Sequence, residues 1–334
     1  VFLLFFIGLE FSLAELEKNF KNIFSVGTVD FLLNFVPAFF IGKLLGFDNL
    51  TSFLIATITY PSSSAIVSKL LIDLKKLANP EVEPVLSILV FEDLVAATLL
   101  AVISNFSSGS LEPVDILKVV FRIALFILIS FALIKVLRRI VDLSIDYSGG
   151  AKEFLVLLVG ALLFSFVEVS LGFGLSEAIG AFVAGTLLGE SSYKERIETV
   201  VVPFRDVFGA LFFLSFGLSI NFSKLSASLI PPLLVLLTFT SLTKIFTGVV
   251  SARLYGLSLK RGISAGLMLL PRGEFSILVA ATSKPLISLS AIYVLLTSFL
   301  GSFAVKESSR ILSLFFKKKE RRKSRLTRSQ LLGD

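Results

Sequence analysis

Residues 50–71 run LTSFLIATITYPSSSAIVSKLL, an apolar segment long enough to cross a bilayer, with Pro61 at its middle. Residues 261–283 run RGISAGLMLLPRGEFSILVAATS and are interrupted in the same way, by Pro271 and Gly273. Proline removes a backbone donor and clashes with the preceding helical turn, so both segments are predicted to break near their centres. Each break alone is compatible with an ordinary proline kink. Two breaks in corresponding segments that run in opposite directions instead indicate a binding site at mid-depth.

The composition around these segments is that of an integral membrane protein. Of the 334 residues, 55% are hydrophobic and 17% are charged, and the mean hydropathy is +0.91. A soluble domain carries about a quarter charged residues, whereas apolar runs of about twenty residues recur here from end to end. A soluble globular enzyme, a coiled coil and a disordered protein are therefore excluded. The runs are continuous rather than alternating, which excludes a membrane β-barrel.

The chain contains neither cysteine nor histidine. This excludes disulfides, thiol chemistry and imidazole metal sites. We therefore expect no cofactor and no enzyme chemistry. Any proton that the protein handles must be carried by a carboxylate, a lysine or water.

Hydropathy predicts an all-α protein with eleven membrane crossings. The first apolar run, VFLLFFIGLEF, begins at Val1 with no basic segment before it, so we interpret the chain as lacking its natural N-terminus. The predicted crossings are 1–14, 23–46, 50–72, 83–104, 114–136, 153–172, 175–189, 203–221, 228–254, 261–283 and 287–304.

The basic residues support this count. One set of alternate loops holds fifteen Lys and Arg, and the stretch from Lys306 to Arg328 holds ten more on the same side. The other loops hold only four, Lys43, Lys118, Lys224 and Lys284. This alternation follows the positive-inside rule, so the tail is expected to be cytoplasmic and to face the anionic lipid of the cell membrane. The net charge of +7 then needs no nucleic-acid partner.

The fourth predicted crossing carries two adjacent acids, Glu92 and Asp93, within VLSILVFEDLVAATLLAVIS (85–104). Buried carboxylates are costly unless paired, and acids within the membrane typically mark ion or proton pathways. Lys244, at the middle of another crossing, is the expected partner. Adjacent helical residues point about 100° apart, so Glu92 can face Lys244 while Asp93 faces a water-filled cavity. For Glu92, a salt bridge that only ties helices together is an equal alternative.

Polar and charged side chains also flank both helix breaks. The half-helix ends carry partial charges, which Arg272 and Glu274 are expected to neutralise. Ser62, Ser63 and Ser64 follow the first break, where a serine can cap the new half-helix. Of these, Ser62 and Ser63 are the candidates to supply hydroxyl oxygens to a cation.

Other charges within or beside the predicted crossings are less informative. Asp30 and Arg122 either pair with each other or line water, and the sequence does not decide between these. Glu168 and Glu177 flank a short turn and are expected at the membrane interface, while Glu10 is expected to be solvated.

Six stretches of this chain together resemble cation:proton antiporter family 2, which includes NapA-like sodium/proton exchangers and Kef-type potassium/proton antiporters. They are spread over nearly the whole chain and keep the order of the family. The matching stretches are LLFFIGLEFSLAEL, SSSAIVSKLL, ILVFEDLVAATLL, GLSEAIGAFVAGTLLGES, PFRDVFGALFFLSFGLSINF and LLPRGEFSILVA.

The resemblance implies an NhaA/NapA-like inverted-repeat fold in which two broken helices cross. Members typically have thirteen crossings, so the eleven here fit a chain without the first two. The resemblance also implies a homodimer. A membrane transporter domain (1–304) would comprise core helices at 23–104 and 228–304, with dimer-panel and linker helices at 1–14 and 114–221. A basic cytoplasmic tail (305–334) would follow.

The resemblance further implies secondary active exchange of a monovalent cation for H+, with both competing for Asp93. Glu92 precedes it where electrogenic sodium/proton members have Asp, and together with Lys244 and PRGEF this favours Na+ or Li+ as the transient ligand of Asp93. A Kef-type K+/H+ antiporter or K+ efflux protein is the alternative. An organic-anion carrier of similar fold is a distant one, because it would not need the acid pair or the mid-span lysine.

Overall fold

The computed structural model describes residues 1–10, 13–105, 113–175, 177–219, 229–283 and 286–330. All thirteen elements identified in these residues are α-helices. In chain order they are α1 (Phe2–Glu10), α2 (Leu13–Leu44), α3 (Asn49–Thr59), α4 (Ser64–Asp73), α5 (Val82–Asn105), α6 (Pro113–Tyr147), α7 (Lys152–Gly172), α8 (Glu177–Gly189), α9 (Lys194–Ser219), α10 (Ile230–Leu254), α11 (Leu259–Met268), α12 (Glu274–Ala281) and α13 (Ile287–Gln330).

Two pairs of consecutive helices are halves of interrupted segments. Helix α3 gives way to α4 across Pro61, and α11 gives way to α12 across Pro271 and Gly273. Counting each pair once, the described helices form eleven consecutive segments. Five stretches among the described residues are long and apolar enough to cross a membrane by length and composition: Glu17–Leu44, Asn49–Asp73, Lys152–Gly172, Ile230–Leu254 and Ile287–Ser313.

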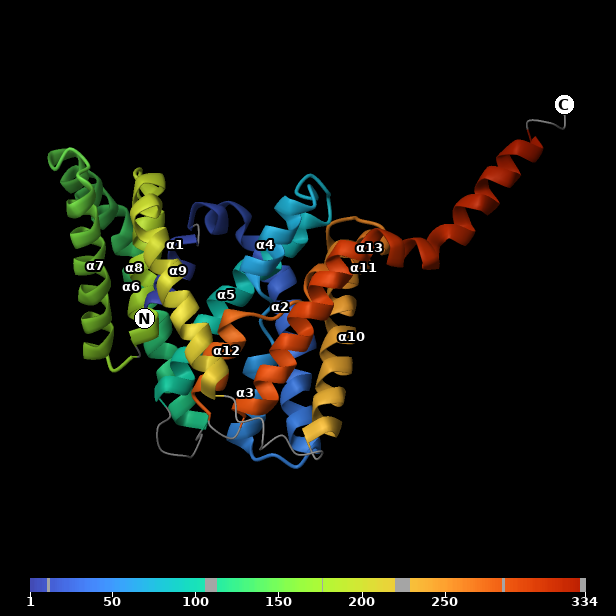
Figure 1. Cartoon of the computed structure of the whole chain (residues 1–334), viewed down its shortest axis with the longest axis horizontal. Coiled ribbons are helices and arrows are strands. Elements are labelled where there is room, and N and C mark those ends of the chain that lie inside the picture. Colours follow the sequence, from blue (N-terminus) through green and yellow to red (C-terminus); the bar gives the residue numbers. More distant parts are fainter. Residues whose placement is uncertain (11–12, 106–112, 176, 220–228, 284–285, 331–334) are drawn as a thin grey trace.

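The helices pack in two groups that meet through α5. The first group contains α1 and α6–α9, and the second contains α2–α5 and α10–α13. Figure 1 shows the first group at the left and the second at the right. Helix α5 belongs to the second group and also packs on α6 and α8 of the first, so the acid pair lies on the helix that joins the two groups.

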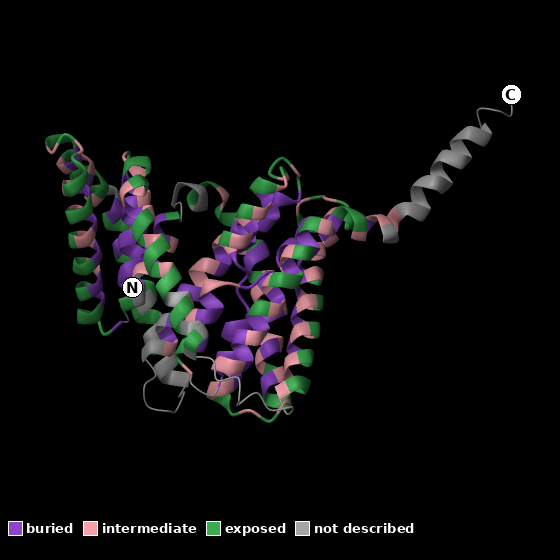
Figure 2. Ribbon diagram, in the orientation of Figure 1, coloured by how far each residue is buried: buried purple, intermediate pink, exposed green. Residues whose placement is uncertain are grey.

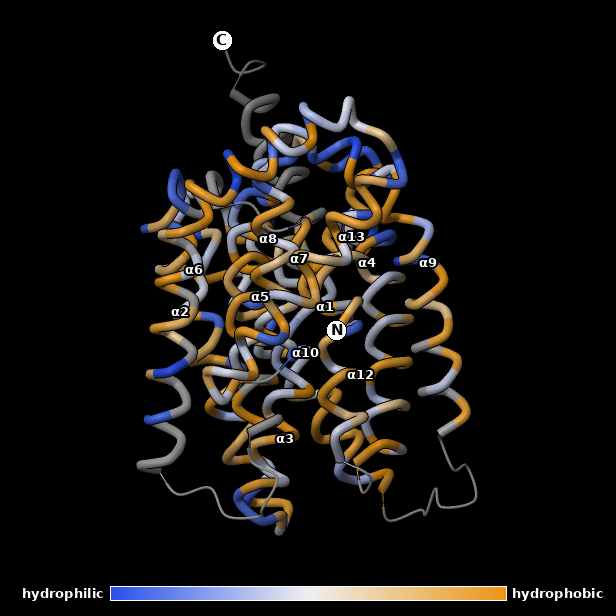
Figure 3. The backbone as a smooth tube through the Cα atoms, turned by 90° about the vertical axis from the view of Figure 1, so that its left-hand side faces the viewer, coloured by the Kyte–Doolittle hydropathy of each residue, from blue (hydrophilic) through white to orange (hydrophobic). Residues whose placement is uncertain are grey.

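Buried residues concentrate around the two helix breaks, whereas the outer faces of the helices expose large apolar side chains (Figure 2). Leu128 on α6, Leu157 on α7, Leu214 on α9 and Leu242 on α10 are all exposed. The hydropathy colouring of Figure 3 shows hydrophobic residues along most of the helices. Apolar faces of this extent are costly in water and favourable against lipid, as expected for a multi-pass membrane protein.

Several helices extend beyond the predicted crossings because the adjoining polar segments remain helical. Helix α13 is the largest case: it continues past residue 304 to Gln330 and leaves the bundle (Figure 1). The stretch 302–330 contains no glycine or proline, and ten of its residues are Lys or Arg. Lysine, arginine and leucine have high helix propensity, which explains the continuation.

Candidate functional site: two crossed helix breaks and a buried charge cluster

The two helix breaks meet inside the second group of helices. The Ser63 amide donates a hydrogen bond to the Pro271 carbonyl oxygen at 2.8 Å, and the Ser62 hydroxyl donates to the Leu269 carbonyl oxygen at 2.9 Å. Gly273 permits this approach, since a Cβ at that position would lie 2.4 Å from Ser63 Oγ. The interrupted segments are therefore joined directly at their breaks.

Arg272 donates hydrogen bonds to carbonyl oxygens at the C-terminal ends of α3 and α11, the half-helices that precede the two breaks. Its side chain is buried, with Nε donating to the Thr59 carbonyl oxygen (2.9 Å) and Nη1 to those of Leu269 (2.7 Å) and Leu270 (3.2 Å). Thr59 ends α3, and Leu269 follows the end of α11. Carbonyls at helix ends lack intrahelical partners and carry partial negative charge. One guanidinium therefore satisfies and neutralises both ends.

Glu274 lies at the N-terminal end of a half-helix, where the partial charge is positive. It is the first residue of α12, where the helix dipole favours an anion. Ser63 Oγ donates to the Glu274 carboxylate at 3.2 Å and accepts from the Ile66 amide at 3.3 Å, which caps α4. Glu274 and Ser63 thus link the N-terminal ends of α12 and α4.

Glu92 is completely buried beside the first break. Its carboxylate accepts a hydrogen bond from the Ser62 amide (2.6 Å), lies 3.2 Å from the Ser62 hydroxyl oxygen, and forms an ion pair with Lys244 of α10. Lys244 also donates to Asp30 Oδ1 of α2 at 2.8 Å. All three charged side chains are 0% exposed. The cluster therefore holds two carboxylates and one ammonium group away from solvent.

Asp30 is the member of this cluster that sequence reasoning left undecided between Arg122 and water. The Asn34 amide group donates to Asp30 Oδ1 (2.8 Å) and to Thr247 Oγ1 (2.9 Å). Lys244 Nζ also lies 5.1 Å from the centre of the Tyr60 ring, a cation–π distance. One feature of the sequence could have indicated that Asp30 belongs to a polar cluster. Asp30 and Asn34 are four residues apart, which puts both on one face of α2.

Asp93 contacts the start of α4 and forms no ion pair with Lys244. Its side chain is partly buried, and Ser64 Oγ donates to Asp93 Oδ1 at 3.4 Å. The three consecutive serines therefore contact three different carboxylates: Ser62 contacts Glu92, Ser63 contacts Glu274, and Ser64 contacts Asp93. Sequence reasoning selected Ser62 and Ser63 as candidate cation ligands, and the structure adds Ser64 as the serine that touches Asp93.

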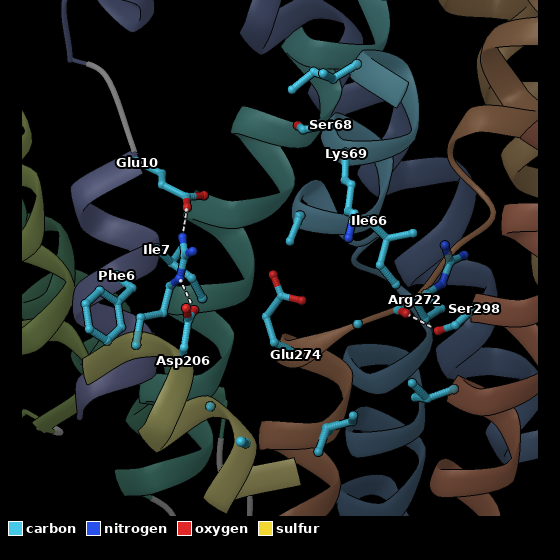
Figure 4. A pocket seen from close by; sticks show the side chains of 18 of the residues that line it. Phe6, Ile7, Glu10, Ile66, Ser68, Lys69, Asp206, Arg272, Glu274 and Ser298 are labelled. Carbon is cyan, nitrogen blue, oxygen red and sulfur yellow. Dashed lines mark hydrogen bonds and ion pairs between the residues drawn. The ribbon is translucent and has the colours of Figure 1, made fainter. Parts of the chain in front are cut away.

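A cavity of about 960 Å³ lies between the two groups of helices. Figure 4 shows Glu274 projecting into it, with Glu10 and Asp206 on one side and Lys69 on the other. Arg205 bridges the two acids, with nitrogen–oxygen distances of 3.2 Å to Glu10 and 3.3 Å to Asp206.

The sequence predicted that Asp93 would face a water-filled cavity, but the structure does not place it in the wall of this one. The described residues that line the cavity include Glu274, Ala65 and Ile66 but not Asp93. Asp93 instead lies against Ser64, whose chain neighbours Ala65 and Ile66 form part of the wall. The first turn of α4 therefore lies between the cavity and this carboxylate.

Comparison with known proteins places the chain in a transporter family. The family model described as "Sodium/hydrogen exchanger, transmembrane" matches residues 1–307. The K(+)/H(+) antiporter subunit KhtU of Bacillus subtilis (strain 168) is 39% identical over 95% of this chain and 79% of its own length. The ammonium/H(+) antiporter subunit AmhT of Alkalihalophilus pseudofirmus is 34% identical over 96% and 82%, respectively. The probable Na(+)/H(+) antiporter GerT of Bacillus cereus is 29% identical over 84% and 74%.

A solved structure supports the same fold. The sodium proton antiporter MjNhaP1 from Methanocaldococcus jannaschii at pH 8 superposes with a TM-score of 0.64 at 19% identity, covering 94% of this chain and 83% of that one. The family model and the relatives above 30% identity confirm the predicted membership of a cation:proton antiporter family. The chain belongs to the transmembrane sodium/hydrogen exchanger family, and the three similar proteins named above carry the names of antiporters, which are transporters rather than enzymes.

Proposed function

We propose that this chain exchanges a monovalent cation for protons across the cell membrane, with both competing for the carboxylate of Asp93. The observation that carries this proposal is the unequal pairing of the two adjacent acids. Glu92 has an ion pair with Lys244, whereas no Lys or Arg among the described residues forms an ion pair with Asp93. Asp93 is thus the carboxylate of the pair that is free to hold either a proton or a cation.

The surroundings of Asp93 suit a monovalent cation that sheds water. The Asp93 carboxylate and the Ser64 hydroxyl supply oxygen atoms at one point, and Ser62 and Ser63 place further hydroxyls at the same break. Oxygen ligands of this kind can replace the hydration shell of an alkali cation. A proton on Asp93 removes the charge that attracts the cation, so one occupant excludes the other and exchange follows.

The packing supports a rigid movement of the second helix group against the first. The order of an intact helix, an interrupted segment and a second intact helix occurs twice, in α2–α5 and in α10–α13. This order is typical of an inverted-repeat transporter with its site at the breaks. The moving core would comprise 23–104 and 228–304, and the panel, which forms a homodimer, would comprise 1–14 and 114–221. The basic tail, 305–334, would lie at the cytoplasmic lipid surface.

Two observations bear on the choice of cation. The similarity to a K(+)/H(+) and an ammonium/H(+) antiporter subunit extends over nearly the whole chain and supports K+ or the similarly sized ammonium ion. The Glu92–Lys244 pair and the PRGEF sequence instead support Na+ or Li+. We place K+ first because the similarity to KhtU covers 95% of the chain rather than one motif.

Proteoliposomes with an imposed pH gradient and a proton-sensitive dye test this proposal. We expect recovery of dye fluorescence on addition of K+, with Rb+, Na+ and Li+ compared at equal concentration. The Asp93→Asn variant should abolish the response to every cation. Asp73→Asn, the same change at an exposed position that lines the cavity, is the matched control and should keep the response. Equal recovery by the Asp93→Asn variant and the unmodified chain would contradict the proposal, and a response to Na+ and Li+ alone would reverse the order of the ions.

A further inference from the structure

A second, smaller pocket lies where α13 leaves the bundle, away from the crossed breaks. It has a volume of about 290 Å³ and is formed by the segment after α4, the start of α11 and the part of α13 near residue 308. Figure 1 shows these ends of α4 and α11 beside α13. The lining is polar and mostly basic or hydroxylic: Lys76, Asn79, Glu81, Ser258, Lys260, Arg261, Ser264, Ser308, Ser309 and Leu312.

The first turn of α11 contributes backbone donors to this pocket. Ser258 is the N-cap residue of α11, and its side chain makes no capping hydrogen bond. The amides of a first helical turn have no intrahelical partner, and the helix dipole adds partial positive charge there. Ser258, Lys260 and Arg261 all line the pocket, so this helix end opens into it. Helix N-termini of this kind bind phosphate and carboxylate groups.

After the ion pairs among these residues are taken into account, the pocket carries a net positive charge. Arg261 Nη1 lies 2.6 Å from Glu81 Oε2, so these two charges cancel. Glu307, which faces Lys76 from α13, is paired with Arg310 at 3.0 Å. Lys76 and Lys260 then remain as ammonium groups without a carboxylate partner of their own among the described residues.

Lys76 is oriented by neutral groups rather than by an acid. Its ammonium group donates to the Val305 carbonyl oxygen (2.6 Å) and to Ser308 Oγ (2.8 Å). An ammonium group has three N–H donors, so one remains for a ligand. Partial burial lowers the pKa of Lys76 below its ordinary value despite the opposing effect of Glu81 and Glu307. A bound anion would compensate for this loss of hydration.

A buried hydroxyl supplies an independent observation. The Ser264 side chain lines the pocket and is only 4% exposed, and it makes no hydrogen bond with any described residue. The Ser264 oxygen is not among the fully enclosed polar atoms without a partner in the described residues, so its hydroxyl is open to the pocket and can donate to a ligand there. Ser264 follows Lys260 by four residues, so the two side chains lie on the same face of α11, and both line the pocket.

We propose that this pocket binds a phosphate group, held by the first-turn amides of α11, Lys76, Lys260 and Ser264. The group is either a free phosphate or the headgroup of an anionic lipid, since both present the same oxygen atoms. The ligand would join three chain segments, namely the residues after α4, the start of α11 and the exit of α13. This site is separate from the crossed breaks, and its test needs no transport.

Thermal unfolding of the full chain in neutral detergent tests the site. Inorganic phosphate should raise the melting temperature more than chloride at equal ionic strength. In nanodiscs, phosphatidylcholine with added phosphatidic acid is compared with phosphatidylcholine alone. A shift with inorganic phosphate identifies a free phosphate site, and a shift with phosphatidic acid alone identifies a headgroup site. The absence of a shift in both arms overturns the proposal.

Two variants and one control make the result specific. Lys260→Gln and Ser264→Ala should each weaken the binding of the active probe, by about tenfold or more for the charged contact. Arg253→Gln removes the same charge from an exposed residue at the end of α10 that does not line the pocket, and it should bind as the unmodified chain does. If Ser264→Ala unfolds, Lys260→Gln alone decides. Binding unchanged in Lys260→Gln overturns the site.

Discussion

Lys244 has two buried carboxylate partners, and this arrangement determines how the charge cluster responds to substitution. Glu92 and Asp30 approach the same ammonium group from α5 and α2, and none of the three is exposed. A buried charge without a partner costs far more than an exposed one. Removal of the lysine therefore leaves two buried carboxylates without a cation, whereas removal of either acid leaves the lysine with one carboxylate partner.

We predict that Lys244→Met lowers the free energy of unfolding by about 3–5 kcal/mol, because it leaves two carboxylates facing each other. Asp30→Asn and Glu92→Gln should each cost less, because Lys244 keeps one acid. Unfolding in detergent measures the three values, with Lys43→Met, at an exposed lysine near the end of α2, as the near-neutral control. An Asp30→Asn loss as large as that of Lys244→Met would contradict the shared pairing.

The sequence predicted the Glu92–Lys244 pair but not the whole cluster. Glu92 and Lys244 each lie at the middle of an apolar segment, where a charge needs a partner. Their similar depth in the membrane therefore predicts that they form a pair. Asp30 has a similar depth, yet its partner depends on the rotation of α2 relative to α10, which hydropathy does not specify. For the same reason, the sequence could not assign each serine to its own carboxylate.

At the scale of the elements, one guanidinium group adds to the serine hydrogen bonds that join the two crossed breaks. Arg272 donates to carbonyl oxygens at the ends of both α3 and α11. Pro61 and Pro271 predicted where the helices stop, because proline cannot continue the backbone ladder. The contact between the two breaks is tertiary, so its hydrogen bonds were visible only in the structure.

We predict that Arg272→Gln lowers the free energy of unfolding by about 2–5 kcal/mol, since buried carbonyl oxygens would lose charge-assisted donors. Hydrogen exchange should rise at residues 60–64 and 269–274, where the breaks meet. Arg253→Gln, an exposed change in the last turn of α10, is the control and should leave both measures unchanged. Unaltered exchange at the breaks in Arg272→Gln would contradict the role assigned to this side chain.

At the scale of the whole molecule, the cavity lies between helix groups that are joined mainly through α5. Hydropathy and the distribution of basic residues predicted the helical membrane body. Hydropathy could not predict which residues line the cavity. The lining depends on how α4 and α12 pack, and this packing places Glu274 rather than Asp93 on the wall.

The proposed movement of the two groups can be tested by cross-linking, because the chain has no native cysteine. Cysteines at Ser68 and Gly209 would face the cavity from α4 and α9, one in each group. A short, cleavable bifunctional thiol reagent across this pair should abolish exchange, and cleavage should restore it. A pair at Ser87 and Tyr255, whose hydroxyl oxygens lie 3.0 Å apart within the second group, is the control. Full exchange with the Ser68–Gly209 pair cross-linked would exclude the movement.

The central claim is that a cation and protons exchange places on the carboxylate of Asp93. The most direct measurement is proton release into weakly buffered detergent solution when K+, Na+ or Li+ is added to the purified chain, followed with a pH-sensitive dye. Release from the unmodified chain and none from the Asp93→Asn variant is the predicted result. Equal release from both proteins would contradict the account, because the exchanged protons would then reside elsewhere.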